Sequence, residues 1–349
     1  GSRQVLERSR GDPELQLDLL QLLARLNLEL DLIEPAATIS EESIALAREV
    51  HGEDSLPFAH ALAQRADNRY RAASYAAAIE DMQQVLRVAD KHPNDTAELR
   101  ARAHMTIGNA LYQIDAYKVA EPQGQLETAL ALFKGAHSTS EDRSRAAYFL
   151  AWTYEPQRDF ARAEALYQDG IDAGRQNFGE KSFVVAFGYE GLADMLRQQQ
   201  RLLEAREAIG KAISIYEFVL GPRHGTVAFA KTNLALIEAA SGRRVEAERL
   251  ADQAVALAQD VFGEHARQVG YPAMYAARLK ANRGELAAAA IAYERALDIF
   301  RRVDPPASHT NRMLRIEYAE VLIALGRTAQ AASSLDESEA AFKAADDTS

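Results

Sequence analysis

The side chains that could carry out chemistry are present in this sequence, but their spacing does not assemble a catalytic site. The chain has eight histidines and no cysteine, which excludes thiolate zinc sites, cysteine nucleophiles and disulfides. No two histidines stand three or four residues apart, the spacing that places two metal ligands on one helix face. Phosphate-binding glycine loops and a nucleophilic-serine elbow are also absent from the sequence. We therefore expect no enzyme activity, no metal and no cofactor.

Charge and hydropathy exclude two further classes of partner. Acidic residues exceed basic ones by 51 to 40, and the resulting net charge of -11 has the wrong sign for holding a phosphate backbone. No apolar run reaches the roughly 20 residues that a membrane-spanning helix needs. Hydrophobic residues make up 48% of the chain, which is enough to build a core. We expect no nucleic acid and no membrane contact by these residues.

A repeated pattern predicts the elements that position the side chains. A turn residue, four variable positions and an alanine return along the chain, as in SGRRVEA at 241–247 and RGELAAA at 283–289. The alanines recur every 42 residues, with one interval of 43. They are Ala36, Ala78, Ala120, Ala163, Ala205, Ala247, Ala289 and Ala331.

Two further columns of small residues share this period. Twelve positions before each alanine stand Ala24, Ala66, Gly108, Ala151, Ala193, Ala235, Ala277 and Ala319. Seven positions after it the residue is again small in most repeats, as at Gly170 and Ala254. Small side chains allow two helix backbones to pack closely, so each repeat is predicted to be a helical hairpin. In the sixth repeat, helix A is predicted over residues 226–240 and helix B over residues 245–261.

Glycines and one proline predict where helices end or start irregularly. Gly52, Gly179, Gly221 and Gly263 follow predicted B helices, where a glycine in the left-handed conformation would end the helix. The third repeat departs from the pattern, because Pro122 and Gly124 fall inside its helix B. Proline is tolerated only in the first turn of a helix, so we expect a late start or a kink there.

The three columns, together with the turn before the column that begins at Ala36, resemble the tetratricopeptide repeat. They resemble its 42-residue variety, which is found in kinesin light chains and many bacterial regulators. The resemblance covers nearly all of the 349 residues. It implies an all-α, right-handed superhelical solenoid of eight hairpins over residues 13–345. A lead-in at 1–12 precedes the solenoid and opens on a Gly-Ser pair typical of a cloning remnant, and a tail occupies 346–349.

The resemblance also implies that the A helices line a concave groove for a protein or peptide ligand. At the inward-facing positions this chain offers aromatic, arginine and asparagine side chains, a composition typical of binding hot spots. The candidate set is Tyr70, Arg102, Asn109, Tyr112, Arg145, Tyr148, Trp152, Phe187, Arg197, Asn233 and Tyr271. The alternative is that individual aromatics of this set pack as core between A helices. The lysine and asparagine pattern with which chaperone adaptors clamp a carboxylate is absent.

Two functions remain open at this point. Residues 3–24 look like the entry to the repeat region of bacterial Ser/Thr protein kinases, which implies a non-catalytic sensor or interaction region of a larger signalling protein. Such a region would be periplasmic if its parent spans the membrane. The alternative is a cytoplasmic peptide receptor or adaptor of the quorum-sensor type. The first A helix, over residues 15–30, is rich in leucine, and a homodimer through the first repeat would cover it.

Overall fold

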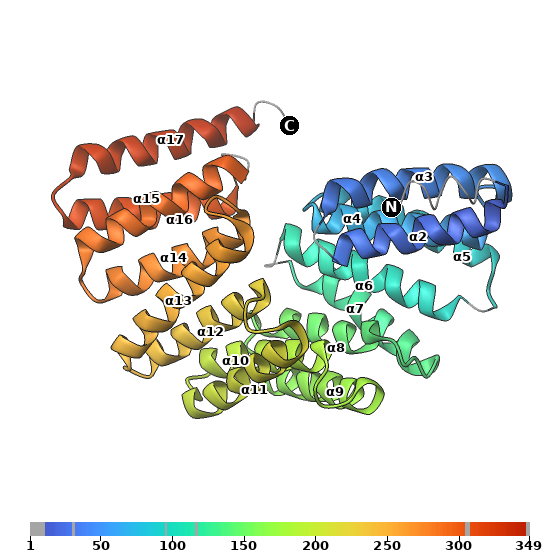
Figure 1. The fold of residues 1–349 in the computed structure, drawn as a ribbon, viewed down its shortest axis with the longest axis horizontal. Coiled ribbons are helices and arrows are strands. Elements are labelled where there is room, and N and C mark those ends of the chain that lie inside the picture. Colours follow the sequence, from blue (N-terminus) through green and yellow to red (C-terminus); the bar gives the residue numbers. More distant parts are fainter. Residues whose placement is uncertain (1–10, 30–31, 95, 116–117, 304–307, 347–349) are drawn as a thin grey trace. The chain divides into compact units, whose positions relative to one another are not determined.

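The computed structural model describes residues 11–29, 32–94, 96–115, 118–303 and 308–346. Within these ranges the chain forms sixteen α-helices (Figure 1). They are α2 (Pro13–Glu29), α3 (Ile33–His51), α4 (Leu56–Arg71), α5 (Tyr75–Lys91), α6 (Ala97–Ile114), α7 (Ala120–Gly135), α8 (Glu141–Tyr154), α9 (Phe160–Phe178), α10 (Phe183–Gln198), α11 (Leu202–Leu220), α12 (Gly225–Ala240), α13 (Arg244–Phe262), α14 (Arg267–Asn282), α15 (Leu286–Val303), α16 (His309–Ala324) and α17 (Thr328–Asp346). No described helix is long and apolar enough to span a bilayer. The predicted all-α class is confirmed.

The helices pair into hairpins, each with an even-numbered A helix and the odd-numbered B helix that follows it. The chain divides into two compact units, residues 1–177 and 178–349. In the first unit the A helices α2, α4, α6 and α8 pack in a row, each against the next. In the second unit α10, α12 and α14 do the same. The 42-residue period runs through both units. That the two units form one continuous solenoid over residues 13–345 stays a prediction.

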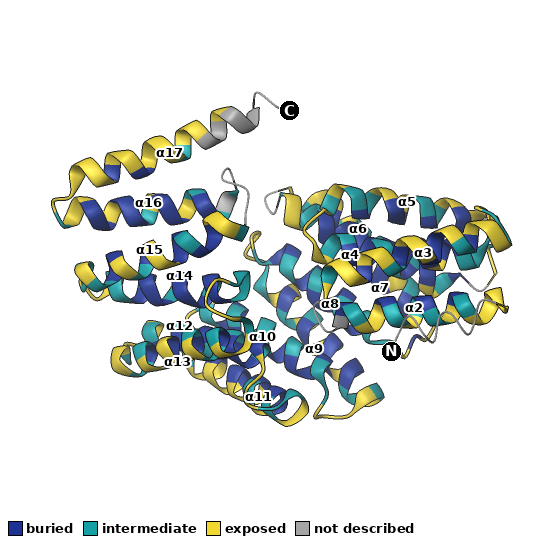
Figure 2. Cartoon of the chain, turned by 45° about the horizontal axis from the view of Figure 1, so that its top comes forward, coloured by how far each residue is buried: buried dark blue, intermediate teal, exposed yellow. Residues whose placement is uncertain are grey.

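The columns of small residues lie at the helix contacts where the sequence places them. Every residue of the column that begins at Ala24 is buried, and so are seven of the eight alanines of the column that begins at Ala36. Figure 2 shows buried residues as stripes along the faces that neighbouring helices turn towards one another. At Gly108 an added Cβ would lie 2.7 Å from Cγ of Leu126 and 3.0 Å from the carbonyl oxygen of Pro122. Close backbone approach therefore explains the small residues.

The third repeat shows the predicted late start of its B helix. Helix α7 begins at Ala120 itself, whereas the other B helices begin three residues before the equivalent alanine. Pro122 is then the third helical residue, in the first turn, where its missing N–H breaks no helical hydrogen bond. Ala120 and Glu127 are exposed, while Pro122 and Ala129 are buried. The packing register is shifted by two residues, so the packing role predicted for Ala120 is wrong.

Two kinds of turn have a positive φ, apart from His137 after α7, whose φ is 50°. The four glycines after B helices have φ between 80° and 87°, as predicted, but ψ is 167° at Gly52 and 154° at Gly221. This is an extended conformation open only to glycine, and the predicted left-handed helical conformation is wrong in ψ. Within hairpins, the turn residue has φ between 58° and 80°. These turn residues are Ala73, Arg158, Gln200, Gly242, Gly284 and Gly326.

Candidate functional site

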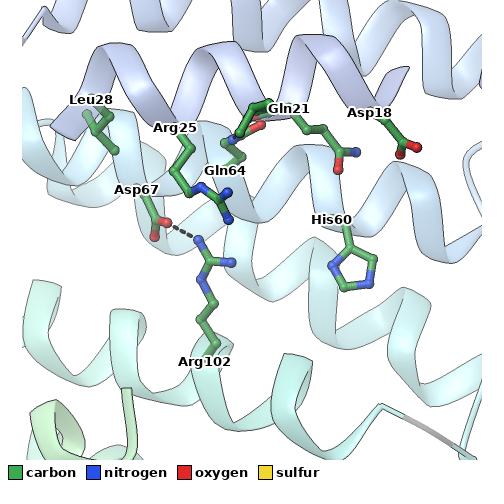
Figure 3. Close-up of a pocket in the computed structure, with 9 residues that line it drawn as sticks. Asp18, Gln21, Arg25, Leu28, His60, Gln64, Asp67 and Arg102 are labelled. Atoms are coloured by element: carbon green, nitrogen blue, oxygen red, sulfur yellow. Dashed lines mark hydrogen bonds and ion pairs between the residues drawn. The ribbon is translucent and has the colours of Figure 1, made fainter. Parts of the chain in front are cut away.

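A polar cavity of about 330 Å³ lies on the A-helix face of the first unit, and we call it the α2/α4/α6 pocket (Figure 3). It is lined by Asp18, Gln21, Leu22, Arg25, Leu28, His60, Gln64, Asp67 and Arg102. On α2, Asp18, Gln21, Arg25 and Leu28 follow one another at three- and four-residue steps, with Leu22 beside Gln21, and the three residues from α4 are spaced in the same way, so each set lies on one helix face. The row of A helices therefore brings three neighbouring repeats to one cavity.

An ion pair across two repeats organises the pocket. Nη2 of Arg102 on α6 donates to Oδ2 of Asp67 on α4. The charge of Asp67, reinforced by that of Asp142, raises the pKa of the Arg102 guanidinium. Burial raises the pKa of the Asp67 carboxyl and outweighs the opposite effect of Arg102. The pair links α4 to α6 and directs the charge of Arg102 into the cavity.

Arg25 adds a second guanidinium from α2. Figure 3 shows Arg25 and Arg102 extending towards one another, with the Asp67 carboxylate beside them. Arg25 is exposed, and it forms no ion pair with any residue that the structure describes. Both guanidinium groups line the pocket, but only Arg102 is paired with the Asp67 carboxylate, so a ligand carboxylate at Arg25 would be stabilised by charge-assisted hydrogen bonds.

His60 contributes a neutral donor at the same cavity. Burial and the nearby charge of Arg102 hold the pKa of the His60 imidazole below its ordinary value of 6.5. At neutral pH the ring is therefore uncharged and can donate or accept one hydrogen bond. The pocket as a whole can hold an anionic group and a short polar segment around it.

The other candidates on α4 and α6 lie mainly within the helix packing. Tyr70 packs edge-on against Tyr75, with ring centroids 5.4 Å apart, and its hydroxyl hydrogen-bonds with Asn109. Asn109 is 4% exposed. Tyr112 is half-buried, and burial raises the pKa of its hydroxyl to about 12. Of the eleven candidates, Arg102 lines the α2/α4/α6 pocket.

Three candidates lie on α8, and one of them is wrong. Arg145 pairs with Glu141 at 3.3 Å, and Trp152 packs against Phe149 with ring centroids 5.0 Å apart. Tyr148 is fully buried and stacks on Tyr167. Its ring lies across Gly170, where any Cβ would overlap it. Because the partner helix carries glycine there, Tyr148 turns into the core, and we withdraw it as a ligand contact.

The four candidates of the second unit do not form one site. Phe187 stacks on Phe183 and Tyr271 packs against Phe300. Arg197 pairs with Asp194 at 2.7 Å and lines a different cavity. Asn233 donates to Oε1 of Glu190 at 2.8 Å, so this amide links α12 to α10 instead of facing a peptide backbone.

Glu190 is a half-buried acid that the candidate set left out. Its Oε2 accepts a 2.9 Å hydrogen bond from the hydroxyl of Tyr216. Burial raises the pKa of the Glu190 carboxyl to about 7, against the two hydrogen bonds that favour the ionised form. The carboxyl is thus half protonated near neutral pH and connects α10, α11 and α12.

The sequence reasoning also missed the α2 side of the pocket. Asp18 occupies the position in the first repeat that gave Arg102 in the third, Arg25 the one that gave Asn109, and Gln21 the inward-facing position between them. The 42-residue register was the signal that could have found them, had it been applied to the first repeat.

Comparison with known proteins agrees with the repeat assignment. Residues 185–260 match the family model described as Tetratricopeptide repeat. A search of curated protein sequences gave no match. A Rap protein complexed with Competence and Sporulation Factor is 15% identical, with a TM-score of 0.66 over 94% of this chain and 87% of that chain. The apo quorum sensor NprR from B. thuringiensis is 12% identical, with a TM-score of 0.66 over 97% and 93% of the two chains.

A signal-transduction ATPase with a tetratricopeptide repeat sensor, from Pyrococcus horikoshii, is 12% identical, with a TM-score of 0.54 over 98% of this chain and 46% of that chain. At these identities the likeness concerns the fold. The hairpins outside residues 185–260 share the 42-residue period, and those at Ala73, Arg158, Gly284 and Gly326 also share the positive-φ turn. The family model thus matches residues 185–260, and the all-α fold of the described residues is the fold of tetratricopeptide-repeat solenoids.

Proposed function

We propose that this chain is a non-catalytic peptide-binding module whose A-helix face in the first unit takes an acidic peptide. The observation that carries the proposal is the exposed guanidinium of Arg25, which forms no ion pair with a described residue and lines the same pocket as the Arg102–Asp67 ion pair. An Asp or Glu side chain, or a terminal carboxylate, would accept charge-assisted hydrogen bonds from Arg25. The fold is one that typically serves binding rather than catalysis.

The neighbouring structures support a peptide as the ligand. The Rap protein was solved with Competence and Sporulation Factor, and its repeats superpose on most of this chain. This favours the receptor or adaptor alternative over a purely structural repeat array. Adjacent helices pack about 10 Å apart, so the four A helices of the first unit span about 30 Å, the length of roughly nine extended residues.

A selection from random displayed heptapeptides, using the whole chain as bait, tests the proposal. We expect the selected peptides to be enriched in Asp and Glu, and Arg25→Ala to weaken their binding by about tenfold. Arg25 makes no ion pair among the described residues, so its removal leaves the helix packing intact. Arg87→Ala, an exposed arginine on the B helix α5, is the matched control and should bind like the wild type. Selected peptides without acidic residues would contradict the proposal.

As a finer proposal, the module is the sensor or interaction region of a larger bacterial signalling protein, in particular a Ser/Thr kinase. It is supported by the kinase-like lead-in at residues 3–24 and by the repeat sensor of the Pyrococcus ATPase. Such a parent would carry a kinase domain and a hydrophobic span before residue 1, with the repeats in the periplasm. Reading the parental gene tests this, and a gene that encodes neither feature would contradict it.

A further inference from the structure

A second cavity, of about 340 Å³, lies in the second unit where helices meet the hairpin turns, and we call it the turn-edge pocket. It lies between the C-terminal ends of α12 and α14 and the start of α13. Leu236 and Leu279 provide an apolar floor, and Leu279 is 9% exposed. Arg197, Arg244, Lys280 and Arg283 bring positive charge to its lining.

The pocket coincides with a break in the repeat pattern at Arg244. Five of the eight B helices begin with a large apolar residue that is half-buried. These residues are Ile33, Tyr75, Phe160, Leu202 and Leu286. In the seventh repeat, Leu286 packs against the hydrophobic core. In the sixth repeat the same position is Arg244, which is exposed, and the space over the leucine floor is left open.

The charges at the pocket leave one arginine without a partner. Arg197 pairs with Asp194 at 2.7 Å, and Lys280 pairs with Asp252 at 3.1 Å. Arg283 pairs with Glu248 and with Glu285. Arg244 forms no ion pair with any described residue, so its exposed guanidinium stands beside the apolar floor without a carboxylate partner. A carboxylate with an apolar tail complements an unpaired guanidinium beside an apolar floor.

We propose that the turn-edge pocket binds an alkyl carboxylate, with the anionic head at Arg244 and the apolar chain over Leu236 and Leu279. The carboxylate can come from a free short-chain acid or from the end of a peptide with an apolar last residue. This site lies in the second unit and is independent of the α2/α4/α6 pocket.

Titration of the whole chain with three probes, followed by ligand-observed NMR, tests the site. The probes are hexanoate, an acetylated tetrapeptide ending in leucine with a free carboxylate, and the same tetrapeptide amidated. We expect at least one of the two carboxylates to bind with a Kd at or below about 1 mM, and the amide to bind at least about tenfold more weakly than its acid. Binding of hexanoate assigns a free acid as a ligand, and binding of the tetrapeptide acid alone assigns a peptide.

Substitution of Arg244 separates the site from the rest of the chain. Arg244→Leu restores the residue found at this position in the fifth and seventh repeats, so the variant is compatible with the fold. It fills the pocket and removes the charge, and we expect about tenfold weaker binding of the carboxylate probe or more. Arg249→Leu, an exposed position on the same helix, is the control and should not change binding, nor should Arg25→Ala in the first unit. No binding of either carboxylate, equal binding of acid and amide, or unchanged binding to Arg244→Leu would overturn the proposal.

Discussion

Single residues in this fold have roles that depend on what the neighbouring repeat places against them. Glu190 is one such residue, because its carboxyl joins Tyr216 and Asn233 from two other helices. Asn233 was expected to face a ligand, yet its amide is bonded to this acid. Tyr148 was expected in the groove, but Gly170 opposite it leaves room for the ring in the core.

Glu190→Gln should remove a pH dependence of stability. Burial holds the pKa of this carboxyl at about 7 in the folded chain, against an ordinary value of 4.5. Between these two values the folded chain keeps a proton that the unfolded chain has lost, so the free energy of unfolding falls as pH rises through this window. We expect Glu190→Gln to be more stable than the wild type by about 2 kcal/mol at pH 8, and to differ little at pH 4.5. Urea unfolding at both pH values measures this.

The matched control for this prediction is Glu264→Gln, an exposed glutamate of the same unit. It should not alter the pH dependence. A Glu190→Gln chain that is equally destabilised at pH 4.5 and pH 8 would show that the hydrogen bonds of the ionised form dominate.

Helices and turns are the scale at which the sequence was most informative. The predicted helices at 226–240 and 245–261 compare with α12 (Gly225–Ala240) and α13 (Arg244–Phe262). Periodic small residues report on backbone contacts, which hardly depend on side-chain conformation, and this made the helices predictable. The pocket of Asp18, Arg25 and Arg102 collects side chains from three repeats. Its shape depends on how long side chains orient, which a period cannot specify.

Gln200→Gly should stabilise a hairpin turn. Gln200 has a φ of 61°, and the N–H of Arg201 after it donates to the carbonyl of Leu196 at 3.0 Å. A non-glycine residue in this left-handed conformation costs about 1 kcal/mol, which glycine avoids at the equivalent Gly242 and Gly284. We expect Gln200→Gly to raise the free energy of unfolding by about 0.5–1 kcal/mol.

The reciprocal change provides the control. Gly284 has a φ of 80° and open space around its Cβ position, so Gly284→Ala tests the backbone alone. It should lower the free energy of unfolding by about 1 kcal/mol in the same urea experiment. Equal stability of both variants and the wild type would mean that the turns relax when substituted.

On the scale of the whole molecule, the first helix bears on self-association. Leu15 and Leu26 on α2 are 48% and 42% exposed, and Leu22 between them, which also lines the α2/α4/α6 pocket, is 41% exposed. These leucines form an apolar stripe along α2. A second copy of the chain would bury this stripe, so we expect a concentration-dependent dimer in sedimentation velocity.

Leu15→Glu with Leu26→Glu should give a monomer, because burying two carboxylates in an apolar contact is costly. Leu203→Glu changes an equally apolar residue that is 78% exposed on α11, and it should leave the dimer intact. A wild-type chain that is monomeric at every concentration would remove the homodimer from the account.

The central claim is that an acidic group of a peptide lies against Arg25 in the first unit. A double-mutant cycle, read by the fluorescence of the sole tryptophan Trp152, tests it most directly. The cycle combines a selected acidic peptide and its Glu→Gln counterpart with the wild type and Arg25→Ala. We predict that each single change weakens binding about tenfold and that the double change weakens it little further. Fully additive losses would show that the two groups do not meet, and would contradict the claim.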